Sequence, residues 1–436
     1  MRVADAKLHE LAGRFGTPLY VYDLDEIAER SETLQRLLPP GIDVAFAVKA
    51  NPSLAVLALF AELGVGADVA SGGELEAVRR AGVDAGSVVF TGPGKRDDEL
   101  EAAVCADLRA ITVESLGELQ RLRQIARRHD RRVPVLLRAA GTAADDAGQP
   151  IIGSGAGKFG IRAADLLQAA GQAARAPELE LLGLHAFHAS NVLDAEVLLA
   201  HAERTMATAA ELARRTGVRF RLVDIGGGLG IPYAEGAPTL DIDRLGRGLG
   251  SLLARWREHP SFDQLRLLVE PGRHLVGPAG MYLSRVIDVK RSDRGFVAII
   301  DGGVHHLLRP ALIGEQQRVR MVPVSERASG GAPVTIAGPL CTGLDVLCHD
   351  ARLPLPEGGD LVCVLDSGAY GFSESMPLFL SHPTPAEVVL QSGVAQLARP
   401  RIEPRAFIDQ QHWGSGMATP PGRRQATARR RPDSTS

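Results

Sequence analysis

Lys49 is the residue of this sequence whose position most strongly suggests chemistry. It follows an apolar segment, Val44–Val48, that has the composition of a buried strand. Burial disfavours the charged form of a lysine, and a neutral amine can form a Schiff base with an aldehyde. A lysine at a strand end can also extend its amine into solvent. For Lys49 alone the solvent-exposed lysine is the more common interpretation, so the rest of the sequence must decide whether Lys49 forms a Schiff base.

Two further motifs could hold a phosphorylated ring. Gly226-Gly227-Gly228 follows an apolar segment, and such glycines expose backbone N–H groups to which a phosphate can bind. Their spacing differs from the dinucleotide-binding fingerprint. Glu270, in Glu270-Pro271-Gly272-Arg273, can keep a pyridine nitrogen protonated, which strengthens the ring as an electron sink. Arg273 can bind a phosphate or a carboxylate. Taken singly, a glycine-rich turn and a structural ion pair explain these residues equally well.

Cys341 and Tyr370 are weaker candidates. A thiol near a cationic site can donate a proton, and Cys341 lies in the glycine-containing segment 338–345. Buried cysteines are more often inert, which is our interpretation of the other cysteines, Cys105, Cys348 and Cys363. Tyr370 lies between glycines after a predicted strand, where its hydroxyl can reach a phosphate or where it is an ordinary turn tyrosine.

The elements that must position these residues alternate between short apolar segments and amphipathic helices. This alternation predicts a parallel sheet, and eight strands favour a closed (β/α)8 barrel over a doubly wound open sheet. Functional residues of such barrels lie at the carboxyl ends of the strands. The predicted strands are Val44–Val48, Gly66–Ala70, Val88–Thr91, Ala110–Val113, Val133–Arg138, Leu181–His185, Arg221–Ile225 and Leu267–Glu270.

The remaining sequence predicts three other regions. Residues 276–412 have strand-like segments separated by Gly, Pro and charged turns, which indicates a second, mostly β domain after the barrel at 31–275. Residues 1–30 contain one strand, Pro18–Tyr22, that we expect to join that β domain. Residues 413–436 are rich in Pro, Gly, Ser, Thr and Arg and lack apolar partners, so we predict a disordered tail.

Composition excludes several classes of protein. The formal net charge of −3 gives the chain no general bias toward nucleic acid or membrane surfaces. No apolar segment is long enough to span a membrane, and the N-terminus lacks the apolar core of a signal peptide. Four cysteines without metal-ligand or disulfide spacing favour the cytoplasm.

Short motifs occur in a fixed order along residues 10–400, and the ordered set is far more specific than any member. They are Ala47–Asn51, Ala70–Glu74, Lys158–Ile161, Gly183–His185, Gly226–Gly228, Glu270–Arg273, Gly338–Cys341 and Gly368–Gly371. This set resembles the fold-type III pyridoxal-phosphate decarboxylases, which include the diaminopimelate, ornithine and arginine decarboxylases. The resemblance implies a phosphate-binding (β/α)8 barrel with a β-barrel domain, and pyridoxal 5'-phosphate as cofactor.

The resemblance also implies the role of each residue. Lys49 forms the Schiff base with the cofactor, Glu270 pairs with the pyridine nitrogen, and Cys341 returns a proton after carbon dioxide leaves. Cys341 reaches the active site of a partner subunit in this family, which implies a homodimer. The residues implied to bind the cofactor are Lys49, Phe187, Ser190, Gly226, Gly227, Gly228, Glu270, Gly272, Arg273 and Tyr370.

Departures from the family pattern concern the substrate. Diaminopimelate decarboxylases have Cys-Glu-Ser where this chain has Cys341-Thr342-Gly343, so the glutamate that binds the distal amine is missing. Arg309 matches a distal substrate arginine, but Ile313 replaces the tyrosine near it. The ring-stacking histidine of the family aligns with Phe187; either Phe187 stacks on the cofactor, which we favour, or a local shift lets His188 do so. The residues implied to contact substrate are Arg273, Arg309, Thr342 and Tyr370.

We therefore predict a pyridoxal-phosphate-dependent decarboxylase of an L-amino acid. The segment 335–342, with Ser381–Pro385, is similar to the subgroup that contains the decarboxylase of carrier-protein-bound L-glutamate in aminoglycoside assembly. The missing distal-amine anchor fits a tethered substrate. The alternatives are a diaminopimelate decarboxylase of lysine biosynthesis, an amino-acid racemase, and a non-catalytic binding protein similar to an antizyme inhibitor.

Overall fold

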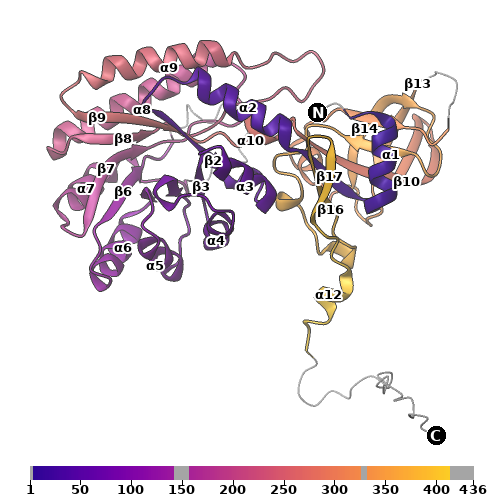
Figure 1. The fold of residues 1–436 in the computed structure, drawn as a ribbon, viewed down its shortest axis with the longest axis horizontal. Helices are drawn as coiled ribbons and strands as arrows, with labels where there is room; N and C mark the ends of the chain where they lie inside the picture. Colours follow the sequence, from indigo (N-terminus) through magenta and orange to yellow (C-terminus); the bar gives the residue numbers. More distant parts are fainter. Residues whose placement is uncertain (1–2, 142–156, 326–330, 413–436) are drawn as a thin grey trace, which may run out of the picture.

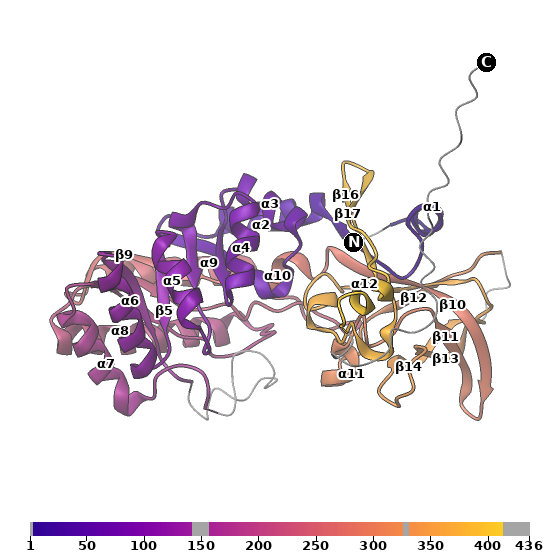
Figure 2. The ribbon, with the colours of Figure 1, turned by 90° about the horizontal axis from the view of Figure 1, so that it is seen from below.

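A computed structural model describes residues 3–141, 157–325 and 331–412 of the chain. They form a helix-covered barrel and a sheet-rich domain that lie side by side (Figure 1). The same division is visible after a quarter turn (Figure 2). The predicted tail at 413–436 lies outside the described residues, and the predicted domain boundaries at residues 30, 275 and 412 stay predictions.

Eight parallel strands close into a barrel in the order in which they occur along the chain. Their closure confirms the predicted (β/α)8 barrel and excludes the open sheet. Each predicted segment overlaps one strand, although the strand ends differ by up to five residues. A buried layer that includes Ala45, Leu136 and Leu268 packs together in one small apolar cluster. The strands are β2 (Ile42–Ala47), β3 (Gly66–Val69), β4 (Val88–Phe90), β5 (Ala110–Val113), β6 (Val133–Arg138), β7 (Leu179–His185), β8 (Phe220–Asp224) and β9 (Phe262–Val269).

Amphipathic helices cover the outside of the barrel (Figure 1). Several begin at side-chain caps: the Ser71 Oγ accepts a hydrogen bond from the Glu74 N–H, and the Ser115 Oγ accepts one from the Glu118 N–H. Such caps satisfy amides that have no partner within the helix. The helices are α2 (Leu24–Leu37), α3 (Leu54–Glu62), α4 (Gly72–Arg80), α5 (Asp97–Cys105), α6 (Leu116–Arg128), α7 (Ala163–Arg175), α8 (Ala195–Thr216) and α9 (Ile242–Arg257).

The second domain is built on a nine-stranded sheet. Its strands are β1 (Leu19–Asp23), β10 (Gly280–Ser292), β11 (Gly295–Ile300), β12 (Val319–Val322), β13 (Gly331–Ala337), β14 (Val346–Pro354), β15 (Leu361–Val364), β16 (Ala386–Gln391) and β17 (Val394–Arg399). As expected, β1 joins this sheet, parallel to β16 and antiparallel to β10. The sequence analysis did not predict β14, β16 and β17. The short helices of this part are α1 (Asp5–Phe15), α11 (Arg309–Ile313) and α12 (Pro404–Ile408).

Helix α10 (Arg273–Val276) connects the last barrel strand to β10, so the chain passes directly from the barrel into the sheet-rich domain. Residues of the loop after β15 meet the carboxyl ends of the barrel strands, because the Tyr370 N–H donates a hydrogen bond to the Ala50 carbonyl oxygen (2.8 Å). No helix in the described part of the chain combines the length and apolarity that a membrane span requires.

Candidate functional site

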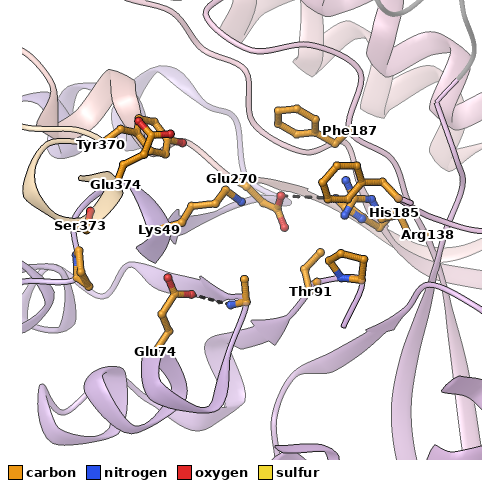
Figure 3. Close-up of a pocket in the computed structure, with 15 residues that line it drawn as sticks. Lys49, Glu74, Thr91, Arg138, His185, Phe187, Glu270, Tyr370, Ser373 and Glu374 are labelled. Atoms are coloured by element: carbon orange, nitrogen blue, oxygen red, sulfur yellow. Dashed lines mark hydrogen bonds and ion pairs between the residues drawn. The ribbon is translucent and has the colours of Figure 1, made fainter. Parts of the chain in front are cut away.

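Every barrel strand has a polar residue at or just beyond its carboxyl end. In strand order these residues are Lys49, Asp68, Thr91, Glu114, Arg138, His185, Asp224 and Glu270. Five of the eight line a cavity of about 370 Å³, together with Phe187 and with Tyr370, Ser373 and Glu374 of the sheet-rich domain. Figure 3 shows these side chains converging from both domains. The cavity is therefore the candidate active site, at the barrel end where the fold favours one.

Lys49 is held by an ion pair. It lies on a short 3-10 turn (Val48–Ala50) after β2, and the β2–β3 register pairs Ala47 with Asp68. The Lys49 Nζ lies 3.0 Å from the Asp68 Oδ2. Burial alone would lower the pKa of Lys49, but the charges of Asp68 and Glu270 outweigh it, and the pKa is raised. The expectation that burial makes this amine neutral is therefore wrong for the chain without its cofactor.

Asp68 is the group placed to receive the proton that Lys49 must lose before it can attack an aldehyde. Its side chain is only 1% exposed. Burial, and after it the charge of Glu270, raises the pKa of Asp68, while Lys49 lowers it. A carboxylate of raised pKa beside a lysine can take up a proton as the amine becomes a nucleophile.

Glu270 and Asp224 share one buried site but differ in charge. Burial opposes ionisation of Glu270, but His185, whose Nε2 lies 3.5 Å from the Glu270 Oε2, and Lys49 together lower the Glu270 pKa to about 2. Burial and the charge of Glu270 raise the Asp224 pKa well above its ordinary value. The proton therefore resides on Asp224. Among the described residues, the Glu270 Oε1 has no hydrogen-bond donor, although it is buried.

The glycine-rich turn and Gly272 allow these groups to approach one another. Gly226 (φ +71°) and Gly228 (φ +88°) have left-handed backbone conformations that favour glycine. A Cβ on Gly227 would collide with the Glu270 carbonyl oxygen. A Cβ on Gly272 would lie 2.8 Å from the Cβ of Ala50, so a glycine there lets the end of β9 pack against the Lys49 turn.

Arg273, Ser190 and Tyr370 lie together, as the sequence analysis expects for residues that bind one phosphate. The Arg273 Nη2 donates a hydrogen bond to the Ser190 Oγ (3.4 Å), and the Nη1 donates one to the Tyr233 hydroxyl (2.6 Å). The guanidinium carbon of Arg273 lies 4.9 Å from the centre of the Tyr370 ring. Arg273 is only 3% exposed. This buried arginine has weak partners, so a phosphate would supply a stronger one.

Phe187 and His188 point in different directions. Phe187 lines the cavity, above Lys49 and Glu270 in Figure 3. The His188 Nε2 lies 2.9 Å from the Thr205 Oγ1 on α8, and the ring packs against His201. The structure thus places Phe187, rather than His188, on the wall that a cofactor ring would face.

Several predicted site residues do not line the cavity. They are Cys341, Thr342 and Arg309, and also the residues expected near the phosphate, Ser190, Gly226, Gly227, Gly228, Gly272 and Arg273. Cys341 is exposed on a loop that is held by Asp345, whose side-chain oxygens accept hydrogen bonds from the Leu340 N–H (2.7 Å) and the Val304 N–H (2.8 Å). Thr342 lies on the same loop. Arg309 is buried, behind Tyr370 and Glu374.

The remaining cysteines differ from one another. Cys348 and Cys363 are buried, as predicted, and burial raises the pKa of the Cys363 thiol to about 12. The prediction that Cys105 is a core residue is wrong, because Cys105 is exposed at the end of α5. Its Sγ lies 3.6 Å from the His129 Nδ1, at the surface of the barrel.

Sequence reasoning assigned a role to only four residues of the cavity wall, Lys49, Phe187, Glu270 and Tyr370. The missed residues are Glu74, Thr91, Arg138, His185, Ser373 and Glu374 on the wall, with Asp68 and Asp224 behind it. One signal was available: a polar residue at the carboxyl end of a predicted barrel strand is a candidate by position alone. That rule finds five of them but not Glu74, Ser373 or Glu374, which lie on a helix and a loop.

The residues present fit pyridoxal phosphate. An ionised, buried carboxylate oxygen without a donor, on Glu270, suits the N–H of a protonated pyridine ring. Lys49 lies on the same cavity and can reach an aldehyde. The glycine turn, Gly226 to Gly228, lies beside Phe187 and Glu270, and a Cβ on these glycines would collide with its neighbours.

Comparisons with known proteins agree with this geometry. A family model described as "Pyridoxal-dependent decarboxylase, pyridoxal binding domain" matches residues 24–277. The chain is 33% identical to the L-glutamyl-[BtrI acyl-carrier protein] decarboxylase of Niallia circulans over 406 residues, which cover 92% of this chain and 94% of that protein. It is also 33% identical to the diaminopimelate decarboxylase of Methanothermobacter thermautotrophicus over 413 residues, 92% of each chain.

A solved structure shows the same architecture. The diaminopimelate decarboxylase of Helicobacter pylori in complex with L-lysine superimposes with a TM-score of 0.83 at 28% identity. The match covers 92% of this chain and 98% of that one. The similarity therefore extends over both domains and includes the cavity between them.

Proposed function

The chain belongs to the pyridoxal-dependent decarboxylases, and from this premise we propose that it removes the α-carboxyl group of an L-amino acid whose far end is joined to a carrier protein. It is an enzyme that uses pyridoxal phosphate, as its family does. An L-glutamyl group held by its side-chain carbonyl is the simplest substrate of this kind. The observation that carries the proposal is the placement of Lys49 and Glu270 on one cavity.

Bound pyridoxal phosphate supplies the electron sink for the charge that remains when carbon dioxide leaves. Lys49 would hold the cofactor at its aldehyde, and Asp68, 3.0 Å away, would take the proton of the lysine amine. Glu270, with its pKa of about 2, would stay ionised and accept a hydrogen bond from the ring N–H. Phe187 would be the side chain available to pack on the ring.

The phosphate is assigned to residues from four parts of the chain. The backbone of Gly226, Gly227 and Gly228 after β8, the Ser190 hydroxyl after β7, Arg273 of α10 and Tyr370 after β15 would hold it. Gly272 acts by letting the Arg273 segment pack closely on the Lys49 turn. Arg273 brings the charge that offsets the phosphate.

Cys341 requires a second copy of the chain in this proposal. Within one chain it is exposed and off the cavity wall. We assign it to the neighbouring active site of a homodimer, where its thiol returns a proton to the α-carbon. Thr342, on the same loop, would then face the substrate of the partner subunit.

A diaminopimelate decarboxylase is the second candidate, because the relative with that activity is as similar as the carrier-dependent one. Two features favour the tethered substrate. Cys341 is followed by Thr342 rather than an acidic residue, so this loop offers no carboxylate for a distal amine. Arg309, which matches the distal substrate arginine of the family, does not line the cavity.

The deciding experiment compares L-glutamyl carrier protein with free meso-diaminopimelate as substrates of the purified protein loaded with cofactor. Mass spectrometry of the acyl carrier protein and of the free amino acid detects the loss of carbon dioxide. We expect release from the carrier-bound substrate. Turnover of diaminopimelate alone would contradict the proposal and establish the second candidate.

A further inference from the structure

The sheet-rich domain contributes one acidic side chain, Glu374, to the cavity wall. The ion pair that Glu374 forms with Arg309 bears on which substrates the cavity can accept. Ser373 and Glu374 lie on a short 3-10 turn (Phe372–Glu374), and both line the cavity next to Tyr370. Figure 3 shows Glu374 beside Tyr370, on the side of the cavity away from Phe187 and Arg138. The Glu374 side chain is 23% exposed, so it remains accessible to a substrate.

Arg309 lies directly behind this wall and is already engaged. Its Nη1 donates hydrogen bonds to the Glu374 Oε2 (3.0 Å) and Oε1 (3.4 Å). Its Nε lies 3.6 Å from the Glu315 Oε2, and its guanidinium carbon lies 5.0 Å from the centre of the Tyr370 ring. With 2% of its side chain exposed, Arg309 cannot reach a substrate without breaking its pair with Glu374.

The cationic side chains that do line the wall are also paired with carboxylates. Lys49 lies 3.0 Å from Asp68, and the Arg138 Nη1 lies 2.8 Å from the Glu114 Oε1. Within the described part of the chain, these two are the only Lys or Arg side chains that line the cavity. A carboxylate at the far end of a substrate would therefore find the Glu374 carboxylate on this wall and no unpaired cation, which is unfavourable in a partly buried site.

We propose that Glu374 is a specificity-determining residue that neutralises Arg309 and restricts the enzyme to amino acids whose far end carries no negative charge. This inference rests on the proposed function and narrows its substrate class. The Arg309–Glu374 pair is neutral as a whole, and the aromatic ring of Tyr370 lies beside it on the cavity wall. An amide or a thioester suits such a wall, whereas a free carboxylate does not.

The test uses three amino acids of similar length: N5-methyl-L-glutamine, L-glutamate and L-ornithine, whose far ends are neutral, anionic and cationic. Binding is measured from the change in absorbance of the lysine-bound cofactor, which needs no turnover. We expect the neutral analogue to bind the parent enzyme at least about tenfold more tightly than L-glutamate, because the carboxylate lacks a partner. Binding of L-glutamate that equals or exceeds that of the neutral analogue would overturn the inference, and so would exclusion of L-ornithine, because an accessible Glu374 carboxylate tolerates a distal cation.

The variant Glu374→Gln keeps the shape of the side chain and removes the nearer carboxylate of Arg309, which leaves only Glu315, 3.6 Å from its Nε. We expect its affinity for L-glutamate to rise at least about tenfold, while its affinity for the neutral analogue changes little. The double variant Glu374→Gln/Arg309→Gln should lose that gain, since the gain comes from Arg309. Glu76→Gln, at the exposed surface of α4, is the matched control. An unchanged preference in Glu374→Gln that is folded by circular dichroism would refute the role of Glu374.

This inference and the proposed function can fail separately. The order of affinities decides the role of Glu374 even if none of the three amino acids is decarboxylated. Carbon dioxide release from the carrier-bound substrate decides the proposed function even if the three affinities are equal. If Glu374→Gln does not fold, the parent enzyme's order of affinities still tests the exclusion of a distal carboxylate.

Discussion

Each barrel strand places a polar side chain at its carboxyl end, whereas the sheet-rich domain reaches the cavity through one loop, residues 370–374. The barrel residues surround the lysine and carry the charges that suit the cofactor. The loop instead supplies Tyr370, Ser373 and Glu374, on the side where the rest of a substrate would lie. We therefore expect the barrel residues to bear mainly on the cofactor chemistry, and Ser373 and Glu374 of the loop to bear on the choice of substrate.

The two contributions also differ in their physical basis. The barrel groups are held by strand register, as when the pairing of Ala47 with Asp68 places Lys49 beside that carboxylate. The loop groups are held by a network of charges and rings, in which Arg309 contacts Glu374 and Tyr370. Substitutions in the barrel should therefore abolish chemistry, and those in the loop should change preference.

The largest effect is expected for Lys49→Ala, on the barrel side. Loss of the amine removes the covalent link to the cofactor, and we expect decarboxylation to fall on the order of 10⁴-fold. The absorbance band of the lysine-bound cofactor should disappear as well. Lys7→Ala, which changes an exposed lysine of α1, should keep both. Full turnover by Lys49→Ala would refute the assignment.

Cys341→Ala tests the contribution of the sheet-rich domain and of the proposed dimer. We expect turnover to fall on the order of 10²-fold, because the α-carbon loses its proton donor. An equal mixture of Cys341→Ala and Lys49→Ala subunits should recover about a quarter of the parent activity, because half of the dimers are then mixed and each mixed dimer has one complete site out of two. No recovery in a mixture shown to exchange subunits would contradict the shared site, and parent-like activity of Cys341→Ala alone would make Cys341 structural.

Acid should destabilise the sheet-rich domain through its buried histidines. Burial, and after it His382, lowers the pKa of His305 to about 4, and burial and His305 lower that of His306. Unfolded histidines have a pKa of about 6.5, so below that pH the unfolded chain binds protons that the folded chain does not. Stability is therefore full above pH 6.5 and decreases as the pH falls toward about 4, by up to about 1.4 kcal/mol per pH unit for each histidine.

Thermal unfolding across this pH range checks the prediction. His305→Asn should show a shallower dependence of Tm on pH than the parent, whatever its absolute stability. His349→Asn, which changes an exposed histidine of the same domain, is the control and should keep the parent slope. Equal slopes for the parent and His305→Asn would contradict the role of His305.

The smallest effect is expected at a helix cap of the barrel. Ser115→Ala removes the acceptor for the Glu118 N–H, and we expect the free energy of unfolding to fall by about 1 kcal/mol. Ser53→Ala is a matched control, because the Ser53 side chain precedes α3 without making a capping hydrogen bond. Urea denaturation measures both. An equal loss in the two variants would show that the cap contributes nothing specific.

The barrel was predictable because its signals are local. Apolar segments such as Val133–Arg138 alternate with amphipathic helices, and eight such units in parallel have few other ways to bury their strands. The strand-end positions of Lys49 and Glu270 followed from the same pattern. Strand β14 was missed because His349, Asp350 and Arg352 interrupt its apolar pattern. Strand β16 was missed although its sequence is largely apolar; it pairs with β1, which lies at the other end of the chain.

By itself, the sequence determined the barrel, because alternating strands and helices are read from local residue patterns. The order of its motifs, through their resemblance to a known family, implied the roles of Lys49, Glu270 and the glycine turn. Only the tertiary structure decided which charges lie near one another. It placed Asp68 and Glu270 where their charges raise the pKa of Lys49, and it placed His185 where it lowers the pKa of Glu270, while burial raises that of Asp224. It also paired Arg309 with Glu374. These outcomes depend on burial and on distances between residues remote in sequence, and no local pattern encodes either of them.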